Sequence, residues 1–333
     1  MWKELRVTHD ARAFWVTGPG TGEIRAEAVP EPGPHEVRVR TLRSAISRGT
    51  ERLVHRGGVP TEQYLRMRAP FQAGDFPWPV KYGYLNVGVV DAGPENLVGR
   101  TVFCLYPHQT RYVVPAHEVT LVPDGMPPSR AVLIGTMETA INALWDAPAL
   151  LGDRVAVVGA GMVGCCLAHL LARMPGVHVT LVDIDPARAD VARALGVSFA
   201  LPGEADGERD LVFHASASAA GLRTSLELLA ADSSMVELSW YGDGEVALPL
   251  GGDFHSRRLG IRASQVGTIA PNARRHWTPA QRRDLAAQLL RDDALGVLLT
   301  DETPFDALPA LMERIAAGLD SGICSVVTYE GDQ

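Results

Sequence analysis

The sequence is poor in cysteine and has no long uninterrupted apolar run. Its 4 cysteines in 333 residues do not form a disulfide framework. Its longest apolar stretches are broken by Gly, Arg or Asp and fall short of the roughly 20 residues that span a bilayer. The segment MWKELRVTHDARAF also lacks the apolar core of a secretion signal. We therefore expect a cytoplasmic protein with no membrane partner.

Positive charge is scarce as well. The formal net charge is −8 and the pI is about 5.7, whereas nucleic-acid binding relies on clustered Lys and Arg. Arginines gather at positions 274, 275, 282 and 283, but aspartates follow them closely, which favours a solvated helix face. We expect no nucleic-acid partner. The length of 333 residues favours two domains.

The first third of the chain has the pattern of a β-rich domain. Short alternating segments are separated by Pro/Gly turns, which is typical of antiparallel strands. The predicted strands cover residues 36–40, 85–90, 101–103 and 112–114. Between them, residues 57–82 form a long connection rich in Pro, Gly and aromatic residues, and such connections often wall a substrate pocket.

From Arg154 the pattern changes to alternating strands and helices. This alternation predicts a parallel sheet with helices on both faces. Predicted strands cover 155–158, 177–182, 211–213 and 235–238, and predicted helices cover 162–174, 186–195 and 219–229. The tail, 304–329, is predicted to be a helix and then a β-type run, which either ends this sheet or returns to the N-terminal domain.

A dinucleotide-binding motif follows the first of these strands. Gly159-x-Gly161-x-x-Gly164 fits G-x-G-x-x-G between a strand and a helix. Gly159 allows the tight turn, Gly161 lets the backbone approach a pyrophosphate, and Gly164 lets the helix pack against the strand. The pyrophosphate then meets free N–H groups at the positive end of the helix dipole. The alternative is a glycine turn that serves packing alone.

An acidic residue stands where the motif requires one. Asp183 ends the second strand, 19 positions after Gly164 (183 − 164), where a carboxylate accepts hydrogen bonds from the adenosine ribose. The same charge repels a 2′-phosphate, so we expect NAD(H) rather than NADP(H) as the cofactor. Asp185 is the alternative acid, and Arg188 is a candidate for the adenine end.

With these motifs the chain resembles the medium-chain dehydrogenase/reductase family of alcohol dehydrogenase relatives. The resemblance spans nearly the whole chain and is carried by PHEVRV (34–39), AISRGTE (45–51), GYLNVGVV (83–90), VGRTVF (98–103) and GTMETAINAL (135–144). The SRGTE run is similar to a branch that includes bacteriochlorophyllide a dehydrogenase-like bacterial enzymes.

The resemblance implies a specific architecture. Its fold class is α/β, with a doubly wound Rossmann sheet and a β-rich, GroES-like catalytic domain split in sequence. We expect residues 1–135 and 272–333 to form the catalytic domain and residues 136–271 to form the NAD-binding domain. The family also implies a homodimer and a small alcohol or carbonyl substrate.

The sequence departs from this family at the zinc ligands. The positions that match the catalytic Cys, His-Glu pair and further Cys or Glu are Ser47, Tyr84-Leu85 and Gly135, and none is a good zinc ligand. Cys104 stands alone where a structural zinc lobe would lie, and Cys165 and Cys166 are expected to pack a helix. We therefore predict no metal. An unconventional site drawn from His55, His108, His117 and Glu51 is the alternative.

Without zinc, a side chain has to protonate the developing oxyanion. Tyr84 occupies the position of the missing histidine ligand and is the candidate acid, with Lys81 expected to lower its pKa. The alternative is that Tyr84 only fills the space of the metal. Glu51 and Glu138 are further candidate acids, or else structural carboxylates paired with Arg48 or Arg52.

The resemblance also implies a set of cofactor contacts. Arg48 matches a phosphate-binding arginine, and Thr139 matches a nicotinamide-side contact. Ala215, Ser216 and Ser239 end later strands, where loops meet the nicotinamide ribose. The other expected cofactor contacts are Met162 and Val163, which lie within the glycine motif, and Ile184, which follows Asp183.

These features predict an NAD(H)-dependent oxidoreductase that interconverts an alcohol and a carbonyl by hydride transfer without zinc. One alternative is a metal-free enoyl or quinone reductase, although such enzymes typically use NADPH. Another is a non-catalytic NAD(H)-binding protein.

Overall fold

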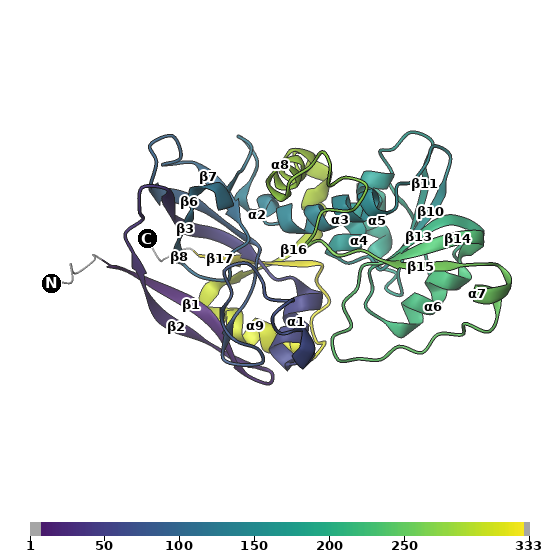
Figure 1. The fold of residues 1–333 in the computed structure, drawn as a ribbon, viewed down its shortest axis with the longest axis horizontal. Helices are drawn as coiled ribbons and strands as arrows, with labels where there is room; N and C mark the ends of the chain where they lie inside the picture. Colours follow the sequence, from purple (N-terminus) through teal and green to yellow (C-terminus); the bar gives the residue numbers. More distant parts are fainter. Residues whose placement is uncertain (1–7, 330–333) are drawn as a thin grey trace. The chain divides into compact units, whose positions relative to one another are not determined.

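The computed structural model describes residues 8–329, and the chain divides into two compact units (Figure 1). Unit 1 contains the chain up to Gly135, residues 287–291 and the chain from Leu299 onward. Unit 2 contains residues 136–286 and 292–298. The sequence-based division assigns residues 272–333 to the catalytic domain, whereas unit 2 of the structure includes residues 272–286 and 292–298 of that stretch.

Unit 1 contains two sheets built mainly from antiparallel strands. The smaller has the order β2-β1-β5-β4 and is dominated by a long hairpin of β1 (Thr8–Gly18) and β2 (Thr21–Pro30). The sequence pattern did not predict this hairpin, because half of the residues of β2 are exposed and the strand shows little apolar alternation. The short strands β4 (Ala73–Gly74) and β5 (Val80–Lys81) come from the long connection, which also holds a 3-10 turn, Thr61–Gln63.

The larger sheet of unit 1 contains the predicted strands and has the order β16-β17-β3-β6-β7-β9, with β8 also paired to β3. Its strands are β3 (Glu36–Ala45), β6 (Asn86–Ala92), β7 (Thr101–Cys104), β8 (Arg111–Pro115), β9 (Thr120–Leu121), β16 (Leu299–Pro304) and β17 (Cys324–Thr328). Because β17 pairs antiparallel with β3, the tail returns to the N-terminal part of the chain.

Helices cover unit 1 at three places: α1 (Arg48–Arg56), α2 (Pro128–Ala131) and α9 (Leu308–Ala316). Helix α1 ends at Gly57, whose left-handed backbone (φ 75°) closes the last turn. Two further 3-10 turns are Ala116–Glu118 and Phe305–Ala307.

Unit 2 contains a six-stranded parallel sheet with the order β12-β11-β10-β13-β14-β15. This is the doubly wound Rossmann order, so the predicted fold class is confirmed. The strands are β10 (Arg154–Val158), β11 (His178–Val182), β12 (Ser198–Ala200), β13 (Arg209–His214), β14 (Leu229–Glu237) and β15 (Gly260–Ala263).

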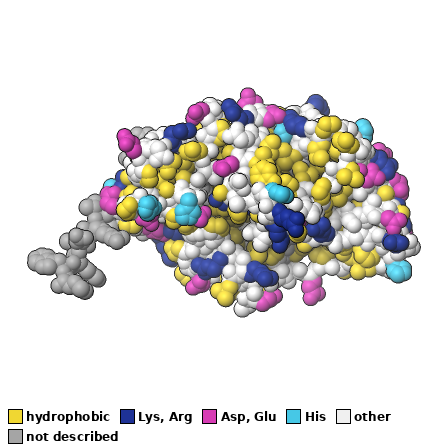
Figure 2. All heavy atoms as spheres, turned by 45° about the horizontal axis from the view of Figure 1, so that its top comes forward, with side chains coloured by type: hydrophobic (Ala, Val, Ile, Leu, Met, Phe, Trp, Pro, Cys, Tyr) yellow, Lys and Arg dark blue, Asp and Glu magenta, His cyan; other side chains and the backbone are white. Residues whose placement is uncertain are grey.

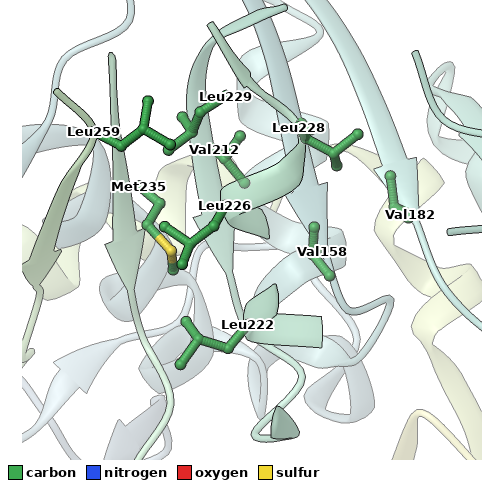
Figure 3. Packing of buried hydrophobic residues seen from close by; sticks show 10 residues of the cluster. Val158, Val182, Val212, Leu222, Leu226, Leu228, Leu229, Met235 and Leu259 are labelled. Atoms are coloured by element: carbon green, nitrogen blue, oxygen red, sulfur yellow. The ribbon is translucent and has the colours of Figure 1, made fainter. Parts of the chain in front are cut away.

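The helices that lie wholly or mostly in unit 2 are α3 (Ile134–Asp146), α4 (Met162–Leu171), α5 (Arg188–Leu195), α6 (Ala219–Glu227), α7 (Asp253–Ser256) and α8 (Pro279–Leu289), with a 3-10 turn at Asp293–Leu298. Leu222 and Leu226 of α6 pack on Val158, Val212 and Met235 of the sheet (Figure 3). Such burial contributes about 1.5–3 kcal/mol for each large apolar side chain.

The arginine cluster differs from its predicted solvated face, because Arg282 and Arg283 are buried. Arg282 donates to Glu138 and Asn142 on α3, so it joins two elements of unit 2. Figure 2 shows charged side chains of both signs on one face of the molecule. Within residues 8–329, no helix is long and apolar enough to cross a bilayer.

Candidate functional site

The glycine motif in unit 2 has the geometry that a dinucleotide requires. Gly159 has φ of 110°, which disfavours a side chain, and a Cβ at Gly164 would lie 1.8 Å from the Gly159 carbonyl oxygen. Gly164 therefore sets the close approach of α4 to β10. At Gly161, by contrast, nothing lies within 4 Å of an added Cβ. The first and third glycines serve the fold, while the second leaves open space.

The start of α4 is suited to an anion. Gly161 is its N-cap, and no side chain caps the first turn. The N–H groups of that turn are therefore available to a ligand at the positive end of the helix. The open space at Gly161 lies at this end, so the residues present fit the pyrophosphate of a dinucleotide.

Asp183 follows β11 and contacts the glycine turn directly. Its Oδ2 accepts a hydrogen bond from the Ala160 N–H (2.6 Å), and its Oδ1 accepts one from the Asp185 N–H (2.9 Å). Asp185 instead caps Ala187 and lies 3.3 Å from Arg188. Beside them Ile184 is 82% exposed, an apolar surface next to the acid.

A polar network that the sequence analysis missed lies at the carboxyl ends of β13 and β14. His214 and Glu237 are register partners, and His214 Nδ1 lies 2.8 Å from Glu237 Oε2. His214 Nε2 lies 2.6 Å from Ser216 Oγ. The predicted cofactor residue Ser239 donates its N–H to Glu237 and accepts from the Ala217 N–H. The signal available in the sequence was a His and a Glu that each end a parallel strand.

Helix α3 carries the predicted contact Thr139 and the candidate acid Glu138. Glu138 is buried, and Arg282 Nε donates to its Oε1 at 3.1 Å. Burial raises the pKa of Glu138, and Arg282 opposes that rise. Glu138 is thus a structural carboxylate, but its partner is Arg282 rather than the expected Arg48 or Arg52.

In unit 1, Tyr84 and Ser47 form a hydroxyl pair. Tyr84 OH donates to Ser47 Oγ at 2.6 Å, and both side chains are partly exposed. Desolvation raises the pKa of Tyr84, an effect opposed by the hydroxyls of Ser47 and Thr50. Tyr84 therefore keeps its proton at neutral pH and serves as a hydrogen-bond donor.

Lys81 does not have the expected effect on Tyr84. Its Nζ donates to Glu27 Oε2 (2.7 Å) and to Gln109 Oε1 (2.6 Å), and it lies 5.8 Å from the centre of the Trp15 ring. Lys81 is buried, and it is not among the groups that shift the pKa of Tyr84. The predicted lowering of the Tyr84 pKa is therefore wrong, because the ammonium is engaged elsewhere.

Glu51 belongs to a buried chain of hydrogen bonds. One oxygen accepts the Ser47 N–H (2.7 Å), and the other lies 2.9 Å from His108 Nε2. His108 Nδ1 lies 2.7 Å from Ser44 Oγ, which lies 2.8 Å from Tyr329 OH. Glu51 is 3% exposed, and its contact with the Tyr84–Ser47 pair is the bond from the Ser47 N–H. Its partner is His108, not Arg48 or Arg52.

Arg48, the predicted phosphate contact, is paired within unit 1. Its guanidinium donates to the carboxylate and the backbone carbonyl of Asp320. Burial would raise the pKa of Asp320, but the Arg48 guanidinium and the Gly322 N–H, which both donate to its carboxylate, lower it.

The candidate metal ligands are not close enough to one another to form a metal site. Over residues 8–329, no group of three or more His, Cys, Asp or Glu side chains is placed to hold a metal ion. His55 is buried, His117 is exposed beside Glu118, and only His108 and Glu51 touch. Ser47 and Tyr84 bond to each other, and Leu85 and Gly135 offer no donor side chain. The residues at the family's zinc position do not fit zinc.

The four cysteines lie in the interior of the protein, which agrees with the packing role expected of Cys165 and Cys166. Cys104, Cys165, Cys166 and Cys324 are all buried, and none of them forms a disulfide. Burial raises the pKa of Cys165 and of Cys324 to about 12, so neither thiol is ionised near neutrality.

Comparisons with known proteins agree with this geometry. Residues 157–187 match the family described as NAD(P)-binding Rossmann-like domain. An L-threonine 3-dehydrogenase of Anaeromyxobacter sp. is 25% identical over 238 residues, which is 60% of this chain and 62% of that protein. One from Sinorhizobium medicae is 27% identical over 241 residues, 62% of this chain and 66% of that protein. The matched regions thus span less than two thirds of these curated relatives.

Solved structures match over a greater length. L-idonate 5-dehydrogenase from Escherichia coli aligns with a TM-score of 0.78 and 16% identity, covering 97% of this chain and 99% of that one. 2R,3R-butanediol dehydrogenase from Bacillus subtilis aligns with a TM-score of 0.73 and 16% identity, covering 96% and 100%. These structures share the fold. With the curated relatives, they support the resemblance to medium-chain dehydrogenases and a nicotinamide-dependent oxidoreductase.

Proposed function

We propose that this protein is an NAD(H)-dependent oxidoreductase that interconverts a small alcohol and its carbonyl compound by hydride transfer, without catalytic zinc. The observation that carries the proposal is the glycine turn of unit 2, with its open position at Gly161 and its bond from Ala160 to Asp183. The bound nicotinamide supplies or accepts the hydride.

Asp183 supports NAD(H) as the cofactor. Its carboxylate is fixed beside the glycine turn by two backbone N–H groups, so it is held at the strand end where the adenosine ribose binds. A fixed carboxylate accepts from two ribose hydroxyls but repels a 2′-phosphate. Met162, Val163, Thr139, Arg188, Ala215, Ser216 and Ser239 complete the proposed contacts of unit 2, and Arg48 is the proposed contact of unit 1.

Tyr84 is proposed as the proton donor. Ser47 Oγ accepts the Tyr84 hydrogen bond, and Glu51 and His108 fix the Ser47 backbone. A phenol with a raised pKa remains protonated near pH 7, so it can stabilise and protonate an alkoxide as it forms. This favours carbonyl reduction as the direction in which Tyr84 contributes most. Lys81 supports the site only indirectly, through Glu27 and Gln109.

A homodimer through the Rossmann sheet is proposed as well. Strand β15 lies at one edge of the sheet, and Ile261 on it is 40% exposed. A second copy related by a two-fold axis would pair or cover this edge.

A paired titration of metal-analysed protein with NADH and NADPH tests the proposal. We expect tight NADH binding, much weaker NADPH binding and substoichiometric zinc, followed by NADH oxidation with members of an aldehyde and ketone panel. Stoichiometric zinc would contradict the metal-free mechanism. A preference for NADPH would contradict the role of Asp183 and favour a C=C reductase. NADH binding without turnover of any carbonyl would favour a binding protein.

A further inference from the structure

The His214 network in unit 2 has the arrangement of an activated serine. Ser216 Oγ lies 2.6 Å from His214 Nε2, and His214 Nδ1 lies 2.8 Å from Glu237 Oε2. A hydroxyl, an imidazole and a carboxylate joined in this order are the parts of a nucleophilic triad, which is recognised by geometry and not by sequence position. The proposed hydride transfer uses Ser216 and Ser239 only as cofactor contacts and gives no role to the His214 imidazole or the Glu237 carboxylate.

The surrounding hydrogen bonds fix where the protons lie. Glu237 accepts from the Ser239 N–H (2.7 Å) and from Tyr241 OH (3.1 Å), so it is an acceptor and His214 Nδ1 carries the proton. His214 Nε2 is then the acceptor for the Ser216 hydroxyl. Ser218 Oγ accepts from the Gly221 N–H (3.0 Å) and donates to Ser216 Oγ (2.9 Å). Each member has one consistent role.

Burial separates the supporting groups from the reactive one. His214 is completely buried, whereas Ser216 is partly exposed and Ser218 is exposed. The imidazole is thus held in one orientation beside a serine that is itself partly exposed. Gly221 makes this possible, because a Cβ there would lie 2.2 Å from Ser216 Oγ and 2.9 Å from His214 Nε2.

The start of α6 provides a place for negative charge. Ser218 is the N-cap of this helix, and its side chain accepts the Gly221 N–H. Ala219 and Ala220 of the first turn are exposed, so their backbone N–H groups face solvent. N–H groups at a helix start stabilise an oxyanion that forms nearby.

We propose that His214 and Glu237 activate Ser216 as a nucleophile toward the acyl group of carboxylic esters. Ser216 Oγ bonds to the acyl carbon while its proton passes to His214 Nε2. The carbon–oxygen bond to the alcohol breaks, and the departing alcohol takes that proton. Water then hydrolyses the acyl-serine by the same route, so no oxidant or reductant is needed.

Labelling with a fluorophosphonate probe, read by intact mass and peptide mapping on the full chain, tests the proposal. We expect one adduct on Ser216, together with hydrolysis of p-nitrophenyl acetate. Ser216→Ala is expected to abolish both, and Glu237→Gln to slow labelling at least tenfold. Ser256→Ala removes an exposed serine hydroxyl of the same unit that has no histidine partner, so it should label normally.

Absence of an adduct in the wild-type protein, or an adduct on any other residue, would overturn the proposal without reference to a variant's folding. The labelling and the ester assay need no nicotinamide and no hydride transfer. Their failure therefore leaves the proposed dehydrogenase function intact, and failure of that function leaves this inference standing.

Discussion

The Ala160 N–H donates a 2.6 Å hydrogen bond to Asp183 Oδ2, which ties the glycine turn after β10 to the end of β11. Two neighbouring strands of the parallel sheet thus meet at one carboxylate. The acid that we propose to select the cofactor therefore also holds the loop that we propose to bind it.

Asp183→Asn is expected to weaken NADH binding about 10- to 100-fold, because a hydrogen bond to a charged group contributes about 1.5–3 kcal/mol. NADPH binding should fall less or improve, since the repulsion of its 2′-phosphate is removed. Fluorescence titration with both cofactors measures this. Asp190→Asn, which removes an exposed carboxylate on α5, serves as the control. An unchanged NADH affinity would show that Asp183 does not contact the ribose.

The glycines of the motif are expected to respond differently to alanine. Gly161→Ala should change the free energy of unfolding by less than about 1 kcal/mol, since its Cβ enters open space. It should nevertheless weaken NADH binding at least tenfold, because that space belongs to the pyrophosphate. Gly164→Ala should destabilise the protein by about 1–3 kcal/mol, because its Cβ meets the Gly159 carbonyl oxygen. Urea unfolding and NADH titration of both variants would separate the two roles. Normal NADH binding by Gly161→Ala would contradict the assignment.

Tyr84→Phe is expected to lower kcat for carbonyl reduction by about 10²- to 10⁴-fold, the usual contribution of a positioned general acid. NADH affinity should not change. Tyr82→Phe is the matched control, because the Tyr82 ring packs edge-on against Tyr84 without belonging to the hydroxyl pair. Steady-state kinetics with a carbonyl found in the panel would measure both. Equal activity of the two variants would show that Tyr84 only fills space.

His108→Ala is expected to destabilise the protein by about 3–5 kcal/mol, because it leaves Glu51 buried without its partner. His117→Ala changes an exposed histidine, so its free energy of unfolding should lie within about 0.5 kcal/mol of the wild-type value. Denaturant unfolding of the two variants gives the comparison. A small loss of stability in His108→Ala would mean that the His108–Glu51 pair contributes little to the stability of unit 1.

Acid should destabilise unit 2 through His169. Burial, together with Arg173, lowers the pKa of His169 to about 4, and its Nδ1 is buried without a hydrogen-bond partner over residues 8–329. In the unfolded chain His169 takes up a proton near pH 6.5, whereas in the folded chain it stays neutral until the pH approaches 4. Stability is therefore lost as the pH falls from about 6.5 toward 4, by up to about 3 kcal/mol.

Unfolding curves at pH 7, 6 and 5 would measure this loss. His169→Gln should be less sensitive to pH over that range, while His178→Gln, at an exposed position, should follow the wild type. Parallel pH profiles for the wild type and His169→Gln would contradict the prediction.

The Rossmann unit could be predicted from the sequence because its signals are local. Val155–Val158 form an apolar run, Gly159 to Gly164 follow at once, and Asp183 lies at a fixed distance along the chain. The β1–β2 hairpin was missed because many side chains of β2 face solvent, so the apolar alternation that marks a half-buried strand is weak there.

The polar contacts depend on non-local geometry. Glu51 and His108 lie 57 positions apart, and no spacing rule joins them. Lys81 is close to Tyr84 in sequence, yet Glu27 and Gln109 hold its ammonium from other strands. His214 and Glu237 were within reach of sequence reasoning, since the ends of adjacent parallel strands meet at one edge of a sheet.

The position of β17 in the larger sheet of unit 1 bears on how the chain is synthesised. It lies between β16 and β3, and Cys324 follows Ala45 by 279 positions (324 − 45). On the ribosome, β3 emerges long before its partner strand β17. Every strand of unit 2 is synthesised between the two. Unit 2 can therefore fold during translation, whereas unit 1 must wait with an open sheet edge, a state in which chaperones are most needed.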